Sequence, residues 1–333
     1  MQSKIYPTQL NSIKLSPSIQ QRLCCPICLT ELELRREGLQ CLNFECNVLF
    51  PVKNGIPILI DEKASLFAIE ELVNPPQTDA DSSLANRLKQ IILKRFIPSL
   101  GQNIKGRKNY QRLAELLLSH SRNPKVLVVG GASFGNGMEA LVSHPTIELV
   151  ESDIVFGDRA NLICDAHSLP FADNSFDAVI VQAVLEHVVD PWRCVEEIHR
   201  VLKADGLVYA ETPFMQQVHM GCYDFTRFTH LGHRRLFRKF EEIDSGAACG
   251  PGMALAWSYE YFLLSFATST LVRRFIELFV RLTAFPLKYL DYLLIDRKGS
   301  FDAASAYYFL GRKSEKILSD RELIQLYRGG FSS

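Results

Sequence analysis

The sequence predicts an α/β protein built around a doubly wound, mostly parallel sheet of seven strands, with a small cysteine-rich module before it and a helical insertion late in the chain. Three observations predict this. Five of the nine cysteines lie between Cys24 and Cys46, apolar runs alternate with helical patterns from residue 122, and residues 250–300 are apolar and aromatic. We therefore divide the chain into residues 1–60, a helical linker 61–121, a core 122–249, an insertion 250–300 and a last strand with a tail, 301–333.

Composition narrows the class of protein. The 333 residues are 47% hydrophobic and 22% charged, as in a chain that buries a core, and 37 basic residues balance 37 acidic ones. A net charge of zero makes nucleic acid a less expected partner. The first twenty residues contain no continuous apolar run, so we expect no signal peptide and a cytoplasmic protein.

The strands and helices of the core follow from hydrophobic patterning. Short apolar runs predict strands over residues 125–130, 147–151, 162–164, 176–182, 206–211 and 306–313. Helical spacing predicts helices over residues 65–73, 84–97, 110–120, 136–143 and 191–202. The link between the second and third strands is too short for a regular crossover helix. The linker helices are rich in Lys and Arg, which we interpret mainly as solvated faces.

The N-terminal cysteines form two pairs. Cys25 and Cys28 are followed after twelve residues by Cys41 and Cys46, which gives the four thiolates of a tetrahedral zinc site on two turns. Four protein ligands leave no open position, so such a zinc would be structural, and the alternative is a metal-free module held by packing. Residues 23–28 and 46–57 resemble the zinc ribbon found at the front of many bacterial methyltransferases, although the second pair is CxxxxC where that module has CxxC.

Ligand-compatible groups follow three successive strands. Gly130, Gly131 and Gly135 lie in a loop that turns from the first strand into a helix, where a ligand can approach the backbone closely. Asp153, or less favourably Glu151, ends the second strand and could accept both hydroxyls of a ribose. Asp165 ends the third strand and could accept an adenine amine.

These motifs resemble the type 11 group of class I S-adenosylmethionine-dependent methyltransferases. The matching segments are VLVVGGASFGNG, LVESDI, DAHSLPFADNSFDAVI, VLEHVVDP and RVLKADG. The resemblance implies that the three glycines and Asp153 hold the donor, that Asp165 and Ala166 frame its adenine, and that Gln182 and Glu186 face its sulfonium. Val128 stands where the family often has an acid. A nicotinamide dinucleotide could occupy the same crevice.

The loop after the fifth strand is the expected acceptor side. An oxygen acceptor must lose a proton, so we expect His187 or His219 to act as a base and Arg227 to orient an anionic acceptor, although either histidine could be structural. We expect O-methylation, more than N- or C-methylation, of a small molecule, a glycan or a lipid-linked metabolite. The alternatives are an RNA methyltransferase that uses the ribbon and the basic linker, and an inactive donor-binding scaffold.

The insertion has two interpretations. Residues 253–272 are long enough to span a bilayer, but their polar residues favour a buried or surface-lying helix. Arg274, Arg281 and Lys288 are seven residues apart, which predicts one basic face on a helix that Pro286 ends or kinks. Residues 253–297 are therefore either a lid over the site or a peripheral membrane contact.

Overall fold

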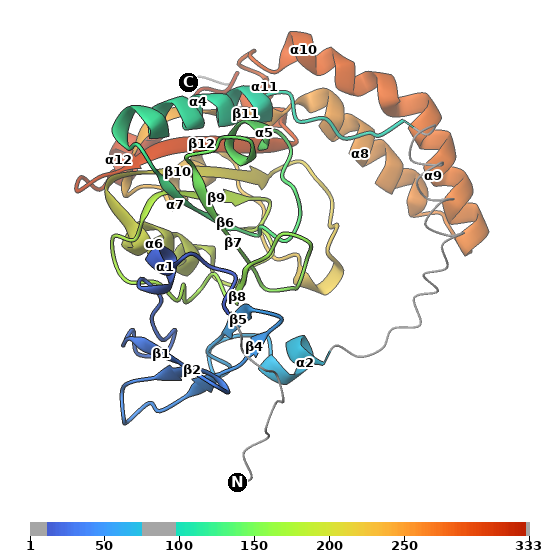
Figure 1. Ribbon diagram of the computed structural model, residues 1–333. Helices are drawn as coiled ribbons and strands as arrows, with labels where there is room; N and C mark the ends of the chain where they lie inside the picture. Colours follow the sequence, from blue (N-terminus) through green and yellow to red (C-terminus); the bar gives the residue numbers. More distant parts are fainter. Residues whose placement is uncertain (1–11, 75–97, 331–333) are drawn as a thin grey trace.

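The computed structural model describes residues 12–74 and 98–330, and its central feature is a twisted sheet of nine strands (Figure 1). Their order across the sheet is β11-β12-β10-β9-β6-β7-β8-β5-β4. In chain order the strands are β4 (Val52–Lys53), β5 (Ile56–Leu59), β6 (Lys125–Val129), β7 (Glu148–Asp153), β8 (Leu162–Cys164), β9 (Phe176–Gln182), β10 (Leu202–Pro213), β11 (Phe240–Cys249) and β12 (Ala306–Lys313).

The core contributes seven strands, β6–β12, of which six lie where the sequence predicts strands and β11 does not, and the N-terminal module adds two more. Strands β5, β8, β7, β6, β9 and β10 pair in parallel, while β12 runs antiparallel between β10 and β11. The module is thus joined to the core through its own strand, because Ile58 and Leu59 of β5 pair with β8. From the sequence alone, we had divided residues 1–60 from the core as a separate unit.

Helices cover both faces of the sheet, as a doubly wound fold requires. Residues alternate along each strand, so Val126 and Val128 of β6 pack under α4 (Gly106–His120) and α5 (Glu139–Val142). Leu127 and Val129 face the opposite side and pack with α6 (Pro191–Val201) and α7 (His230–Leu236). Helix α6 begins at Pro191 with Asp190 as its N-cap, and α7 begins after the N-cap Thr229.

The N-terminal module carries a small sheet of its own. Strands β1 (Leu32–Arg35), β2 (Gly38–Cys41) and β3 (Leu49–Phe50) pair antiparallel, after the short helix α1 (Pro17–Gln20). Phe50 and Leu23 share one buried cluster with Phe171 of the core. The linker supplies α2 (Ile69–Val73), which is shorter than the expected helix, and the expected helix 84–97 lies outside the described residues.

The insertion forms an arm that projects from the sheet (Figure 1). It consists of α8 (Pro251–Leu264), α9 (Thr270–Ala284), the 3-10 segment η2 (Phe285–Leu290), α10 (Asp291–Leu294) and α11 (Ser300–Ala303). The chain also contains the 3-10 turn η1 (Gly221–Tyr223) and a late helix α12 (Asp320–Ile324). In the described part of the chain, every helix is too short or too polar to cross a membrane.

The predicted basic face of the insertion is wrong beyond α9. The helix ends at Ala284, two residues before Pro286, and η2 turns the next residues in another direction. Lys288 is consequently buried, and its ammonium donates to the backbone oxygen of Ser99 at 2.5 Å. Arg274 and Arg281 remain on α9, exposed to solvent.

Candidate active site

A cavity of about 880 Å³ opens at the carboxyl ends of the central strands. Its walls come from the loop after β6, from the ends of β9 and β10, from the segment before α4, from the loop after β10 and from the first turn of α8. This is the edge at which parallel α/β sheets bind ligands. Because α8 contributes Met253 to the wall, the insertion closes one side of the cavity.

The glycines of the loop after β6 lie in close contact with neighbouring side chains. Gly130 has a φ of +79°, and a Cβ there would lie 2.3 Å from the Val184 side chain. A Cβ on Gly135 would lie 2.3 Å from Oε1 of Gln182. Gly130, Gly135 and Gln182 all line the cavity, as expected. Gly131 lies outside the lining, where it packs on the Cβ of Glu151.

A buried polar network forms the floor of the cavity. Glu211, at the end of β10, accepts hydrogen bonds from Nε2 of Gln182 at 2.7 Å and from Nδ2 of Asn103 at 2.8 Å. The hydroxyl of Tyr209 also donates to Glu211, and the Tyr110 hydroxyl donates to Gln182 at 3.1 Å. Burial raises the pKa of Glu211, and these three donors oppose that rise. Strands β9 and β10 and the segment before α4 are thereby held around one carboxylate.

Sequence reasoning missed Glu211 and Asn103. Glu211 was inside a predicted strand, at its carboxyl end, so the rule applied to Asp153 and Asp165 would have selected it. Asn103 carried no comparable signal, because it lies in the irregular segment before α4, more than a hundred residues from its partner.

The two aspartates expected to bind the donor's sugar and base lie at the predicted strand ends, outside the cavity lining. Asp153 accepts hydrogen bonds from the backbone N–H groups of Ala132 at 2.9 Å and Ile154 at 2.7 Å. Glu151 forms an ion pair with Arg159. The carboxylates of Asp153 and Glu151 therefore hold together the end of β7.

Asp165 is engaged by two neighbours. Its carboxylate accepts from the Ser65 hydroxyl at 2.5 Å and contacts Nδ1 of His167 at 2.6 Å. Burial alone would raise the pKa of Asp165, but these hydrogen bonds outweigh burial and hold it below the usual value. Ala166 follows it and packs against the core. Ser65 belongs to the linker, so this segment crosses the strand end at which adenine was expected.

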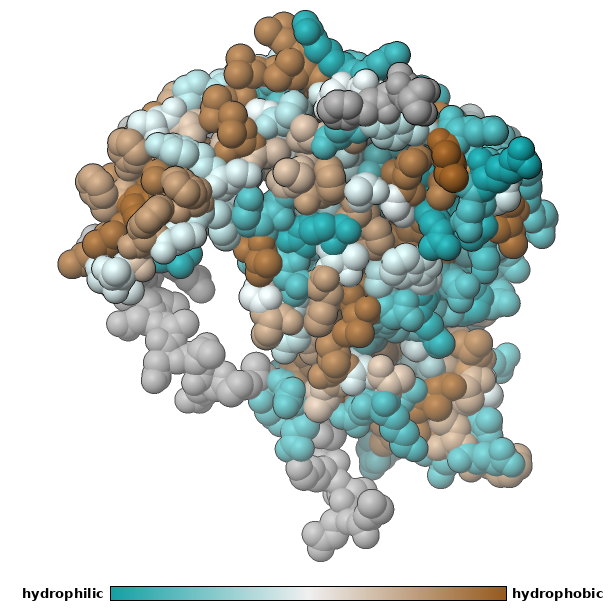
Figure 2. Space-filling model, turned by 180° about the vertical axis from the view of Figure 1, so that it is seen from behind, coloured by the Kyte–Doolittle hydropathy of each residue, from teal (hydrophilic) through white to brown (hydrophobic). Residues whose placement is uncertain are grey.

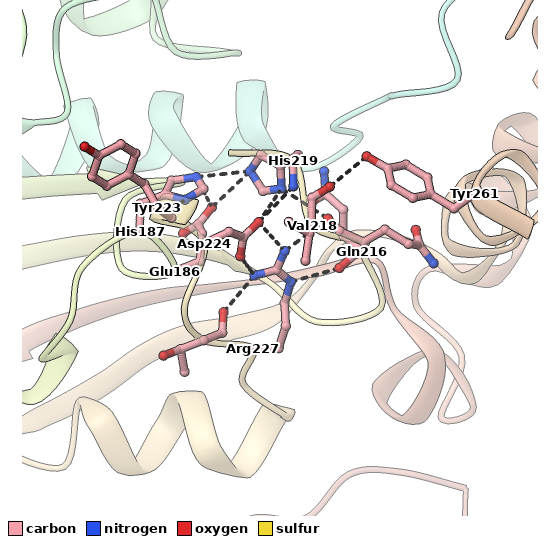
Figure 3. A network of polar contacts seen from close by, with 11 residues as sticks. Glu186, His187, Gln216, Val218, His219, Tyr223, Asp224, Arg227 and Tyr261 are labelled. Carbon is pink, nitrogen blue, oxygen red and sulfur yellow. Dashed lines mark hydrogen bonds and ion pairs between the residues drawn. The ribbon is translucent and has the colours of Figure 1, made fainter. Parts of the chain in front are cut away.

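Glu186, His187 and His219 converge beside the cavity (Figure 3). Nε2 of His187 lies 3.1 Å from Nε2 of His219, and Oε1 of Glu186 lies 3.7 Å and 3.9 Å from these two nitrogens. Burial raises the pKa of Glu186 to about 8 and lowers that of His187. Glu186 and His219 line the cavity, whereas His187 lies outside the lining.

Arg227 holds the loop that carries His219. Its five N–H groups meet the carboxylate of Asp224 and the backbone oxygens of Gln216, Gln217 and Thr226. These hydrogen bonds keep the pKa of Asp224 well below its usual range. With every donor engaged and no place in the cavity lining, Arg227 is a structural residue here and does not have the acceptor-orienting geometry that the sequence suggested.

The four cysteine sulfurs of the N-terminal module lie within 4.8 Å of one another. The Sγ atoms of Cys25 and Cys46 are 3.8 Å apart, and those of Cys28 and Cys41 are 3.5 Å apart. Sulfurs around a tetrahedral zinc at about 2.3 Å would be separated by about 3.8 Å. Both separations are much longer than a disulfide bond of about 2.05 Å. Cys24 is buried beside this cluster and is not a member of it.

Part of the core is similar to a known protein family. Residues 142–210 match the family described as a methyltransferase domain. The chain contains a methyltransferase domain. A demethylmenaquinone methyltransferase from Staphylococcus epidermidis is 38% identical over 80 residues, which are 24% of this chain and 30% of that protein. The chain thus spans less than a third of that relative's length.

Two further proteins are similar to parts of this chain. A UPF0434 protein from Hydrogenovibrio crunogenus is 33% identical over 57 residues, 17% of this chain and 85% of that protein, so the chain belongs to the UPF0434 family over that stretch. The phosphoethanolamine N-methyltransferase 2 of Haemonchus contortus, solved with S-adenosyl-L-methionine, covers 61% of this chain and 53% of its own at 14% identity, with a TM-score of 0.37. The strand order places the glycine loop of β6 at the centre of the sheet.

Proposed function

We propose that this chain transfers a methyl group from S-adenosyl-L-methionine to an oxygen of a small-molecule, glycan or lipid-linked acceptor. The observation that supports it best is a single cavity whose lining combines residues suited to the donor with residues suited to an acceptor. Gly130, Gly135 and Gln182 suit a donor, and Glu186 and His219 face the remaining space. Methyl transfer depends mainly on aligning acceptor, carbon and sulfur, which such a shared cavity would do.

The donor side of the cavity fits the methionine end of the donor. The absent side chain of Gly135 leaves room beside Gln182, and Arg107 in the same lining offers a cation for a carboxylate. Bound S-adenosyl-L-methionine supplies a methyl group on a cationic sulfur. We keep Asp153 for the ribose and Asp165 with Ala166 for the adenine, with the Ser65 hydroxyl sharing Asp165.

In this proposal His219 acts as the general base. It lines the cavity, and its ring stands against that of His187, with centroids 4.7 Å apart. A proton taken from an acceptor hydroxyl at Nε2 of His219 would meet Nε2 of His187 at 3.1 Å. The pair therefore offers a path for the proton away from the reacting oxygen.

The test is incubation of the full chain with methyl-labelled donor and separate fractions of lipids, glycans, small metabolites and RNA. We expect label in one of the first three fractions. His219→Asn should lower turnover at least about 100-fold while S-adenosylhomocysteine still binds. Label in RNA would favour the alternative acceptor, donor binding without label in any fraction would favour the inactive scaffold, and binding of NADH in place of S-adenosylhomocysteine would overturn the donor assignment.

We further propose that the arm contacts a lipid surface. Figure 2 shows hydrophobic side chains gathered on the insertion, where Leu271 is 76% and Phe275 is 70% exposed. Arg273 and Arg274 lie between these two residues on α9 and are exposed, so cations border the apolar surface. An apolar helix face bordered by arginines suits the interface of an anionic membrane.

Vesicle flotation tests this contact. The full chain should float with vesicles of phosphatidylcholine and phosphatidylglycerol, and Phe275→Glu should reduce the bound fraction several-fold. Phe44→Glu is the matched control, because Phe44 is equally an exposed phenylalanine but lies in the N-terminal module. A wild-type chain that stays unbound, or equal losses in both variants, would refute the lipid contact.

We also propose that Cys25, Cys28, Cys41 and Cys46 hold a structural zinc ion. The separations between their sulfurs support this, together with the small size of the module that they join. Four thiolates would complete the coordination of this ion, so it would stabilise the module and take no part in the reaction.

A further inference from the structure

The side chains of Glu186, His187 and His219 bring three potential metal ligands together. The three side chains come from two separate segments, the loop after β9 and the loop after β10, and their ligand atoms all lie within 4.8 Å of one another. The two imidazoles meet Nε2 to Nε2 at 3.1 Å (Figure 3). One carboxylate oxygen lies within 4 Å of both nitrogens.

The carboxylate in this cluster is buried without a conventional partner. Glu186 is 1% exposed, and neither of its oxygens has a hydrogen-bond partner among the described residues. Isolating a carboxylate from water costs several kcal/mol unless a cation or donors compensate it. Its Oε1 atom lies 3.7 Å and 3.9 Å from the Nε2 atoms of the two histidines.

The surroundings of the two rings determine where their protons reside. Nδ1 of His187 lies 2.8 Å from the backbone oxygen of Tyr223, which only accepts, so this nitrogen carries a proton. Nδ1 of His219 faces the backbone oxygen of Gln217 at 3.3 Å and Oδ2 of Asp224 at 3.4 Å, which are again acceptors. With their Nδ1 atoms directed at acceptors, both rings turn Nε2 toward each other.

Three potential ligand atoms therefore converge, two imidazole nitrogens and one carboxyl oxygen. A cation among them would compensate the buried carboxylate. The surroundings also match those of metal-binding histidines, whose second nitrogen donates to a carbonyl or a carboxylate that fixes the ring. Arg227 anchors Asp224 behind His219 and keeps this support in place.

We propose that Glu186, His187 and His219 bind a divalent first-row transition-metal ion. Two imidazoles and one carboxylate form a common ligand set for Zn²⁺ and Fe²⁺ sites that keep open positions. Ligands about 2.0–2.1 Å from a tetrahedral ion lie about 3.3–3.4 Å apart. The separations of 3.1, 3.7 and 3.9 Å lie on either side of that value.

The open positions of this ion would face the cavity, because Glu186 and His219 line it. An acceptor hydroxyl bound there would lose its proton more readily, as water does on a bound zinc. This use of the ion rests on the proposed methyl transfer, whereas binding of the ion does not. With the metal bound, His219 is a ligand, and the ion replaces it as the group that activates the acceptor.

The test is metal binding to the full chain after exhaustive chelation, with Zn²⁺ as the probe and calorimetry for stoichiometry and affinity. We expect the double variant His187→Asn/His219→Asn to bind one equivalent fewer than the wild type, and the exposed control His120→Asn to bind the same number. Glu186→Gln keeps the size of the side chain and should weaken the same site at least about 10-fold. Cys25→Ser should remove a different equivalent, which separates this site from the ribbon.

Equal stoichiometry in the wild type and the double variant, with Glu186→Gln also unchanged, would overturn the metal site and leave the two histidines as a pair that shares a proton. Far-UV circular dichroism and the melting temperature of each variant show whether the fold is retained. Metal binding without methyl transfer to any acceptor would instead refute the proposed function and leave the site standing.

Discussion

His233 on α7 provides a test of how burial sets the charge of this protein. The ring is 2% exposed and is packed edge-on against Phe237, with centroids 5.2 Å apart, and against Phe309 at 6.5 Å. Its Nε2 has no hydrogen-bond partner among the described residues. Burial, followed by the nearby His230 and Arg234, lowers the pKa of His233 to about 3. The imidazole is therefore neutral in the folded protein.

Folding must then become less favourable as the solution is acidified. In the unfolded chain His233 binds a proton below its ordinary pKa of 6.5, and in the folded chain it does so only near 3. A depressed folded pKa gives stability that is present above 6.5 and is lost as the pH falls. Between about pH 7 and pH 5 the linkage relation gives a loss of about 2 kcal/mol for this residue alone.

The perturbation is His233→Phe, which keeps a ring among its aromatic neighbours and removes the titrating group. Urea unfolding, followed by tryptophan fluorescence at about pH 7 and pH 5, should show a pH-dependent loss of stability about 2 kcal/mol smaller than in the wild type. His230, whose pKa burial lowers to about 4, should account for a similar share in both proteins. His120→Gln, an exposed control, should leave the pH dependence unchanged. Equal pH dependence in His233→Phe and the wild type would refute the reasoning.

Three other predictions follow from single contacts. Cys41→Ser should remove one equivalent of zinc, measured by elemental analysis, and lower the melting temperature; unchanged zinc content and stability would contradict a structural site. Gly135→Ala should weaken S-adenosylhomocysteine binding at least about 10-fold in calorimetry, because the new Cβ lies 2.3 Å from Oε1 of Gln182, whereas Gly299→Ala, with open space around it, should bind normally. Arg227→Lys should reduce the free energy of unfolding by about 1–3 kcal/mol, measured in urea, because one ammonium cannot replace five directed N–H groups. Donor affinity should change little. A selective loss of donor affinity would contradict a structural role for Arg227.

The central strands could be predicted because parallel strands buried on both faces read as continuous apolar runs. Residues 162–164, 176–182 and 306–313 form strands with the predicted bounds. Strand β11 was missed because its first half, Phe240 to Ser245, is mostly polar, and its second half uses small residues that pack under Tyr308. An edge strand of this kind has neither alternation nor a continuous apolar run.

For the cavity-lining part of the site, the rule that ligands bind at strand ends selected Gly130 and Gly135, and the resemblance to methyltransferases added Gln182 and Glu186. The same rule could not foresee how the neighbouring acids are used. Asp165 meets a serine one hundred residues earlier in the chain, and that contact depends on where the linker runs after β5. For Arg227, the charge pattern suggested a ligand, but the turn around Asp224 saturates the guanidinium locally.

The end of α9 connects the arm to the cavity. Periodicity extended this helix to Lys288, whereas the break after Ala284 turns η2 and α10 back toward the start of α8. There the buried carboxylate of Asp291 accepts hydrogen bonds from the backbone N–H groups of Gly252 at 2.7 Å and Met253 at 2.9 Å. Met253 lines the cavity, so the first turn of α8 belongs both to the site and to the arm that carries the exposed apolar surface. An acceptor with an apolar tail could keep that tail on the arm while its polar end enters the cavity, which is why we place lipid-linked molecules among the expected acceptors.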